Sequence, residues 1–348
     1  MTVLKTKTLI GVFLLSMGAT TVSLAFASEN GVPGIAKWYG NKAAAVSLRF
    51  DDSTDSHVKY VIPKLNEYGI KATFMVNPGL GRYRENIDFW EREFPRTGHQ
   101  LGNHTMHHRG AKTPEEADYE IGEASRRIWR LFPGQGKLLV FASGGGGVRW
   151  GGKDWDTASK EYRDLVSKYF LIDLYDGRHP YLGANSKHGE DEINRSIEKA
   201  VQERRHQAIV FHDVGTPDVI DYLRWIKNGY RLTYSRESFE KIIAFLRAKE
   251  DVLWTAPLGD VLKYEAERDG AALALLSKSP KQVRLALTVQ TDPELYDHSL
   301  TVILPWKGNP QVTSILQGED RIDRFAFEGP SLRFSVRPVN SVIDIRFE

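Results

Sequence analysis

Residues 43–52 read Ala-Ala-Ala-Val-Ser-Leu-Arg-Phe-Asp-Asp. The run is mostly apolar and leads directly into two adjacent carboxylates, Asp51 and Asp52. An apolar run of this length, bounded by polar residues, is typical of a buried strand. It therefore predicts a central strand whose last residues project two acids from one edge of a sheet.

Similar apolar runs recur as far as residue 255, and helical patterns lie between most of them. This alternation predicts a mostly parallel sheet with helical crossovers, either open or closed as a barrel. The predicted strands are 43–50, 71–76, 100–103, 137–142, 169–174, 207–211 and 251–255. The predicted helices are 57–68, 114–132, 155–168, 190–204, 235–249 and one more after Leu258.

The alternation stops near Gly270, and short strand patterns separated by turn residues follow it. The predicted strands are 282–289, 299–304, 312–316, 324–327, 332–336 and 342–347. Period-two alternation, as in Val283, Leu285 and Leu287, is typical of half-buried antiparallel strands. We therefore expect an α/β domain over residues 28–269, followed by a small, sandwich-like antiparallel β-domain over 270–348.

The N-terminus has the three-part layout of a secretory signal peptide. Lys5 and Lys7 precede an apolar run, which ends in a small-x-small pattern at residues 25–27. A membrane anchor is the alternative, but glycine, serine and threonine dilute the run. We expect cleavage after Ala27, no stable membrane anchor thereafter, and a periplasmic or extracellular protein.

Composition restricts the chemistry. The chain of 348 residues has 47 Lys and Arg, 45 Asp and Glu, ten His and no Cys. The absence of cysteine excludes a thiol nucleophile, a disulfide framework and a cysteine-ligated metal. Without Lys5 and Lys7 the formal charge is zero, which does not favour binding to nucleic acid by charge alone.

Candidate functional residues follow three of the predicted strands. Asp51 and Asp52 end the first, His104 and His108 follow the strand 100–103, and His212 follows the strand 207–211. In parallel α/β proteins the site lies at the carboxyl ends of the strands. These carboxylates and imidazoles are therefore predicted to meet at one rim.

The residue types suit a metal site. We expect His104 and His108, four residues apart, to share one face of a helical turn and to bind one ion. One carboxylate with two histidines leaves a coordination position open for water. Thr105 stands where a zinc peptidase would have its glutamate, so the base must come from elsewhere, and Asp51-Asp52 supplies it.

The motifs Phe50-Asp51-Asp52, His104-Thr105-Met106-His107-His108 and Phe211-His212-Asp213 resemble those of the polysaccharide deacetylases with a NodB homology domain, carbohydrate esterase family 4. The resemblance covers roughly residues 43–264. It implies a distorted (β/α)7 barrel and a divalent metal, with zinc expected and cobalt, nickel or manganese as alternatives.

The resemblance also implies roles for individual residues. Asp51 matches the general base, Asp52 together with His104 and His108 matches the metal ligands, and His212 matches the general acid. The implied reaction is direct hydrolysis of an acetyl group on a glycan, with an N-acetyl amide favoured over an O-acetyl ester. The expected partner is an acetylated glycan, and the sequence does not indicate the oligomeric state.

The sequence departs from the family pattern in two places. Residues 143–147, Ser-Gly-Gly-Gly-Gly, replace an arginine-containing segment that orients the base and supplies an oxyanion donor. Gly144 and Gly145 could offer backbone N–H groups, and Arg149 or Arg178 could replace the arginine. Asp173 and Asp176 are the candidates for the acidic partner of His212.

Other functions remain as alternatives to compare. A carbohydrate-binding relic and a small-molecule amide hydrolase would both fit the same barrel. Residues 147–154 fail as a phosphate-binding loop because Asp154 stands where Ser or Thr should bind magnesium. Ser143 lacks the Gly-x-Ser-x-Gly context of a serine hydrolase. Residues 215–234 form an insertion in which Trp225 is a candidate to contact a glycan.

Overall fold

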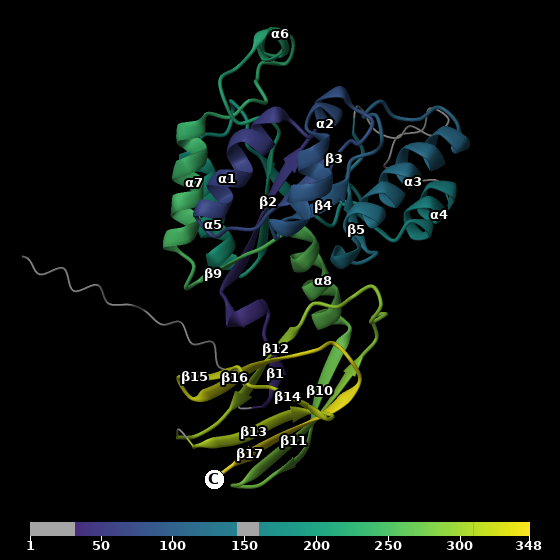
Figure 1. Cartoon of the computed structure of the whole chain (residues 1–348). Helices are drawn as coiled ribbons and strands as arrows, with labels where there is room; N and C mark the ends of the chain where they lie inside the picture. The colour runs from purple at the N-terminus through teal and green to yellow at the C-terminus, as the bar shows by residue number, and fades with distance from the viewer. Residues whose placement is uncertain (1–31, 145–159, 309) are drawn as a thin grey trace, which may run out of the picture.

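The computed structural model describes residues 32–144, 160–308 and 310–348. The predicted signal peptide, Gly145 and Arg149 lie outside the described residues. Figure 1 shows an α/β part above and an all-β part below, with helix α8 between them. No helix among the described residues is long and apolar enough to cross a membrane.

The α/β part contains a curved parallel sheet of seven strands in the order β6-β5-β4-β3-β2-β8-β7, with β9 paired to β2. The predicted distorted barrel is thereby confirmed, and β2 pairs with three strands, β3, β8 and β9. The strands are β2 (Ala44–Asp51), β3 (Thr73–Val76), β4 (Gln100–Asn103), β5 (Leu139–Phe141), β6 (Leu171–Asp173), β7 (Tyr181–Gly183), β8 (His206–Phe211) and β9 (Leu253–Thr255).

Helices follow most of these strands, as the alternation predicts. They are α1 (Ile62–Glu67), α2 (Gly81–Glu85), α3 (Pro114–Leu131), α4 (Lys160–Lys168), α5 (Glu190–Glu203), α6 (Val219–Asn228), α7 (Arg236–Ala248) and α8 (Leu258–Asp269). Short π or 3-10 turns also occur: η1 (Tyr39–Asn41), η2 (His57–Val61), η3 (Phe89–Glu93), η4 (Phe94–Arg96) and η5 (Pro133–Gln135). Thr113 caps α3 by accepting from Glu116 N–H, as a capping residue does.

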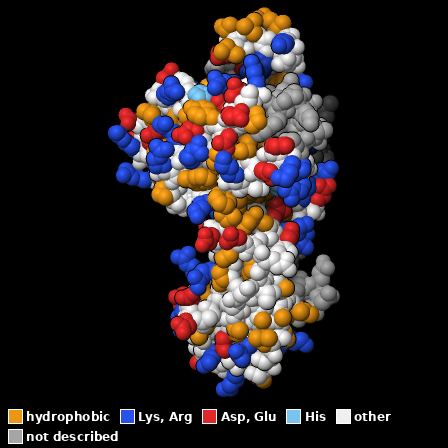
Figure 2. Space-filling view, turned by 90° about the vertical axis from the view of Figure 1, so that its right-hand side faces the viewer, with side chains coloured by type: hydrophobic (Ala, Val, Ile, Leu, Met, Phe, Trp, Pro, Cys, Tyr) orange, Lys and Arg blue, Asp and Glu red, His pale blue; other side chains and the backbone are white. Residues whose placement is uncertain are grey.

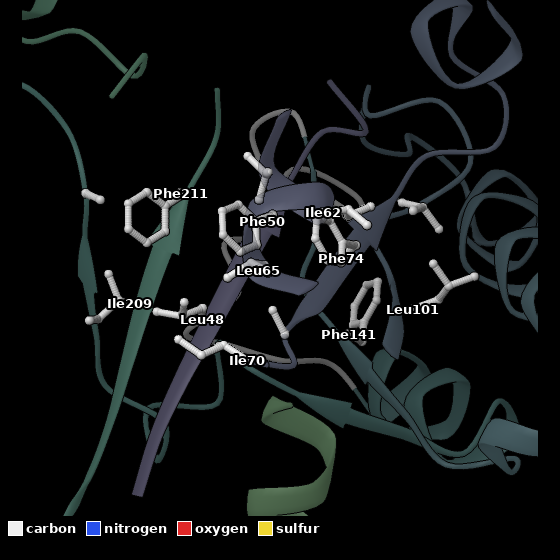
Figure 3. Packing of buried hydrophobic residues seen from close by; sticks show 14 of the residues in the cluster. Leu48, Phe50, Ile62, Leu65, Ile70, Phe74, Leu101, Phe141, Ile209 and Phe211 are labelled. Atoms are coloured by element: carbon white, nitrogen blue, oxygen red, sulfur yellow. The ribbon is translucent and has the colours of Figure 1, made fainter. Parts of the chain in front are cut away.

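The two faces of β2 separate the packing core from the site. On the face of the sheet covered by helices, Phe50 stacks on Phe74 and Phe211 (Figure 3). Its ring centroid lies 5.0 Å from that of Phe74 and 5.2 Å from that of Phe211. Because neighbouring strand residues point to opposite faces, Arg49 and Asp51 lie on the other face. That inner face continues into a small apolar cluster closed below by Leu258 and Leu262 of α8.

The C-terminal strands form two antiparallel sheets, ordered β10-β11-β17-β13-β14 and β1-β12-β16-β15. A single cluster of fully buried apolar side chains from both sheets, with Leu285 and Val302 among them, forms the core of this part. The strands are β1 (Gly34–Ile35), β10 (Ala271–Lys278), β11 (Gln282–Val289), β12 (Leu300–Pro305), β13 (Val312–Gln317), β14 (Asp320–Arg321), β15 (Phe325–Glu328), β16 (Ser331–Val336) and β17 (Ser341–Phe347).

Sequence patterning missed four strands, β1, β7, β10 and β14, for identifiable reasons, and β14 is only two residues long. β1 pairs with β12, so residues 34–35 join the C-terminal strands although they precede the barrel in sequence. β10 is exposed along most of its length and therefore lacks a clean period-two pattern. β7 is only three residues long and has no buried residue. The domain boundaries at residues 28, 269 and 270 stay a prediction.

Candidate active site

Asp52, His104 and His108 form the only group of three or more potential metal ligands among the described residues. Asp52 Oδ1 lies 3.3 Å from His104 Nε2 and 2.9 Å from His108 Nε2. The ligand atoms lie within 4.8 Å of one another. One small cation could therefore contact all three, as an open carboxylate–bis-imidazole site requires.

The backbone around these ligands is not helical. Asp52, Ser53, Thr105 and His108 all have positive φ angles, between 52° and 80°. Our expectation that His104 and His108 share one face of a helical turn is therefore wrong, although the two side chains do converge. Left-handed backbone at non-glycine residues is costly and persists where surrounding contacts impose it, commonly at functional sites.

Buried polar side chains supply those contacts. Asn77 Nδ2 donates to the carbonyls of His104 and Thr105. Thr105 N–H donates to Asn103 Oδ1 at 2.8 Å, and Asn103 is held in turn by bonds to α3. A Cβ at Gly144 would collide with the His108 ring. The chain after β5 thus needs glycine at residue 144 to pack against this ligand.

The donors present fit a divalent cation. His104 Nδ1 lies 2.7 Å from the Ala142 carbonyl, which can only accept, so in the neutral ring Nε2 carries a lone pair. That lone pair faces Asp52 Oδ1, which has no hydrogen-bond partner of good geometry among the described residues. Two electron-pair donors facing each other in a buried site need a shared cation, and imidazole with carboxylate suits a transition ion.

The pKa shifts of Asp52 and His108 agree with a negatively charged Asp52 at this site. Burial alone would raise the pKa of Asp52, but the imidazoles of His104 and His108 beside it hold that pKa far below its usual value. Burial opposes protonation of His108, but the Asp52 carboxylate raises its pKa above the ordinary value. Asp52 is therefore an ionised carboxylate beside two imidazoles, those of His104 and His108.

Asp51 has a different neighbour, Arg49. The guanidinium forms a bidentate pair with the carboxylate: Nε donates to Oδ1 at 2.7 Å and the second contact is 2.5 Å. Both side chains are almost fully buried. Burial raises the pKa of Asp51, but Arg49 and His104 outweigh it and keep the carboxylate ionised.

Arg49 is the arginine that contacts Asp51, whereas sequence analysis named Arg149 or Arg178 as candidates for orienting the base. Arg178 instead pairs with Asp176 in a largely exposed position. The signal for Arg49 was present, because residues two apart on a strand share a face and an arginine within an apolar strand needs an acidic partner. Tyr175 and Tyr181 flank its guanidinium, with ring centroids 5.8 and 5.9 Å away.

His212 lies at the same rim, directly after β8. Its backbone carbonyl accepts from His57 Nε2, which fixes this turn against η2. Burial lowers the pKa of His212 below its ordinary value, while Asp51 and Asp52 oppose this lowering. The imidazole thus shares an electrostatic environment with both carboxylates of the site.

Several predicted contributors have other partners. Asp173 accepts from Tyr162 Oη at 2.9 Å and from Tyr175 N–H at 3.0 Å. Asp176 accepts from Arg178, so the contacts found for these two acids do not pair either with His212. Trp225 is on α6, where the side chain of Arg231 covers its ring. Gly145 lies outside the described residues.

The fold and this site define an α/β barrel with a candidate metal centre beside an oriented carboxylate. Residues 39–150 match the family model for polysaccharide deacetylase. The resemblance inferred from the motifs is confirmed by this match. The matched segment contains Asp51, Asp52, His104 and His108 but ends before His212.

Individual relatives are distant. A gellan lyase from Bacillus sp is 20% identical over an alignment of 320 positions that covers 83% of this chain; the chain spans only 12% of that protein. The peptidoglycan deacetylase PdaC from Bacillus subtilis is 18% identical, with a TM-score of 0.43, over 66% of this chain and 95% of its own. A carbohydrate esterase family 4 pseudoenzyme from Bacillus anthracis is 16% identical, with a TM-score of 0.39, over 64% and 66%.

Proposed function

We propose that this protein is a metal-dependent hydrolase that removes acetyl groups from an N-acetylated polysaccharide or oligosaccharide. The observation that carries the proposal is the convergence of Asp52, His104 and His108 beside the buried Arg49–Asp51 pair. Polysaccharide deacetylation is the activity of the family that residues 39–150 match. The ligand set suits zinc, with cobalt, nickel or manganese as alternatives.

Each residue then has a distinct task. Asp52, His104 and His108 would hold the ion, which when bound acts as a Lewis acid that lowers the pKa of a coordinated water. Asp51, kept ionised and oriented by Arg49, accepts the proton of the attacking water. His212 donates a proton to the departing sugar nitrogen, and backbone N–H groups near Gly144 are suited to stabilise the oxyanion.

The experiment measures acetate release after the metal content has been controlled. Protein stripped with chelator and reloaded with one metal at a time is incubated with chitin oligomers, peptidoglycan, acetylated xylan and small cyclic amides. We expect metal-dependent acetate release from an N-acetylated glycan. If the wild type binds glycan but releases no more acetate than Asp51→Asn does, the non-catalytic alternative is favoured. If acetate or another product is released only from small amides, the small-molecule alternative is favoured.

We also propose that the protein is exported after cleavage behind Ala27. The basis is the charged, apolar and small-residue order of residues 1–27. Recovery of the protein outside the cytoplasm with Ser28 at its N-terminus would support this. A retained Met1 on cytoplasmic protein would contradict it.

A further inference from the structure

Helix α6 turns its apolar side away from the protein. Its only buried residue is Asp221, whereas its large apolar side chains are 47 to 72% exposed. These side chains are Val219, Ile220, Tyr222, Leu223, Trp225 and Ile226. Hydrophobic side chains accordingly gather over α6 at the top of Figure 2. A helix of a globular protein normally does the reverse, so the outward face is unpartnered.

Helix α6 is carried by residues 215–234, which we call the arm, and this segment is held by its own hydrogen bonds. Asp218 caps the N-terminus by accepting from Asp221 N–H, and Gly229, in left-handed conformation, ends the helix. The Asp221 carboxylate accepts from the N–H groups of Leu232 and Thr233 at 3.1 and 2.8 Å. The polar side of α6 therefore makes the hydrogen bonds that hold the arm together. The apolar side remains available for another contact.

The base of the arm adjoins the candidate active site. Val214 and Tyr234 form a β-bridge, and Tyr234 N–H donates to the Asp213 carbonyl at 2.8 Å. His212 is the next residue toward β8. Whatever α6 contacts is thus held near the rim that bears the proposed catalytic groups (Figure 1).

Basic side chains lie beside the apolar face. Lys227 is exposed on α6, Arg231 covers the Trp225 ring at 5.4 Å, and Lys187 covers the Tyr230 ring at 4.8 Å. Arg224 is also on the helix, and its partner Asp221 is buried. Residues 215–234 thus carry three basic residues, Arg224, Lys227 and Arg231, against two acids, Asp218 and Asp221. The exposed surface is apolar and aromatic, with a small excess of positive charge.

We propose that α6 docks on the surface of an anionic lipid bilayer, with its apolar side chains among the acyl chains and its lysine and arginine side chains at the headgroups. Aliphatic, aromatic and basic residues on one short helix are the combination that interfacial helices use. The contact is peripheral and reversible, and it does not require a membrane-spanning anchor. It would hold the catalytic rim toward glycan near the membrane.

Two other occupants fit α6 less well. Val219, Ile220, Leu223 and Ile226 offer aliphatic surface, whereas a glycan would be bound by aromatic faces with polar groups between them. A second copy of the chain would need about 800 Å² per partner for a stable interface. A ten-residue helix, about 15 Å long and about 10 Å wide, offers on the order of 200 Å² on one face.

The test is co-sedimentation with vesicles of equal parts phosphatidylglycerol and phosphatidylcholine, compared with phosphatidylcholine alone. The protein is recovered after export, and its N-terminus is read by mass spectrometry. The variant Ile220→Ser/Leu223→Ser/Ile226→Ser removes aliphatic surface from α6. Leu275→Ser/Leu276→Ser is the matched control, because these leucines are 45 and 52% exposed on β10, outside the arm.

We expect the wild type and the β10 control to bind the anionic vesicles alike, and the α6 variant to bind about tenfold or more weakly because apolar contact is lost. Lys227→Glu should weaken binding to the anionic vesicles and leave binding to phosphatidylcholine unchanged. Unchanged melting temperatures show that the variants fold. Equal binding by the α6 variant, no binding by the wild type, or a dimer that the α6 substitutions abolish would overturn the proposal.

Discussion

The two ends of the barrel each bury a pair of acids, but the pKa values of the two pairs are shifted in opposite directions. At the upper rim, Asp51 and Asp52 face Arg49 and two histidines, and both have pKa values below the usual range despite burial. At the lower end, burial raises the pKa of Asp260 and raises that of Glu267 to about 8. The nearby cation there, Lys263, lies 2.7 Å from the more exposed Asp297 instead.

This contrast shows that charge state depends on neighbours more than on residue type. Ionised carboxylates at the rim can bind a cation or accept a proton. Glu267 is on α8, is fully buried and accepts a hydrogen bond from His298 N–H, so a charge there would be poorly solvated. The upper acids are therefore suited to chemistry, and the lower ones to closing the base of the barrel.

The largest expected effect is that of Asp52→Asn. The amide removes the negative charge that holds the ion, so we expect loss of bound metal and a decrease in kcat/KM of about 10⁴-fold, which corresponds to several kcal/mol of lost stabilisation. Metal content is measured by mass spectrometry beside acetate release. Asp55→Asn, three residues further along the chain, is the matched control and should retain both. Full metal occupancy in Asp52→Asn would remove this residue from the ligand set.

Asp51→Asn should show that Asp51 and Asp52 have different functions at the rim. We expect kcat to fall by about 10³-fold because the proton acceptor is lost, while metal content stays at the wild-type level. Isothermal titration with zinc and acetate-release kinetics measure the two effects on one preparation. Equal loss of metal in both variants would mean that Asp51 and Asp52 act as one ligand pair.

Arg49→Lys tests whether the bidentate contact matters beyond its charge. A lysine cannot reproduce the two parallel hydrogen bonds, so Asp51 loses its fixed orientation and its pKa rises. We expect kcat to fall by about tenfold or more, metal binding to be retained and the acidic limb of the pH–kcat/KM profile to move to higher pH. A lower melting temperature with an unmoved pH profile would indicate a purely structural arginine.

The smallest effect is predicted at the lower end. Because the pKa of Glu267 is raised on folding from 4.5 to about 8, its contribution to the free energy of unfolding is present below pH 4.5 and is lost as the pH rises through 8. Glu267→Gln should remove this dependence. It should melt like the wild type at pH 5 and a few degrees higher at pH 8.5. The exposed Glu294→Gln is the control, and the same melting difference at both pH values would refute the assignment.

Sequence reasoning predicted most of the barrel because its signals are local. Residues 100–103 are a strand in both the prediction and the structure, and α3 ends one residue short of the predicted helix 114–132. The strands that escaped prediction have weak local signals. β1 is two residues long and pairs with β12, more than 260 residues later in the chain.

The candidate ligands were also identifiable from sequence, although the reason given for one pair was wrong. Spacing suggested a helical turn for His104 and His108, whereas left-handed residues 105 and 108 bring the rings together. Buried hydrogen bonds to Asn77, which follows β3, and to Asn103, which ends β4, impose that backbone. Spacing along one segment does not record such contacts.

The sequence by itself determined most elements of the barrel and excluded thiol chemistry, because strand and helix periods, chain order and the absence of cysteine are local or compositional properties. It also placed Asp51, Asp52, His104 and His212 at strand ends. Only the tertiary structure decided that Arg49 orients Asp51, that Asp173 and Asp176 have other partners, and that α6 faces its apolar side outward. These depend on burial and on which side chains of separate segments meet, and a one-dimensional pattern does not contain that information.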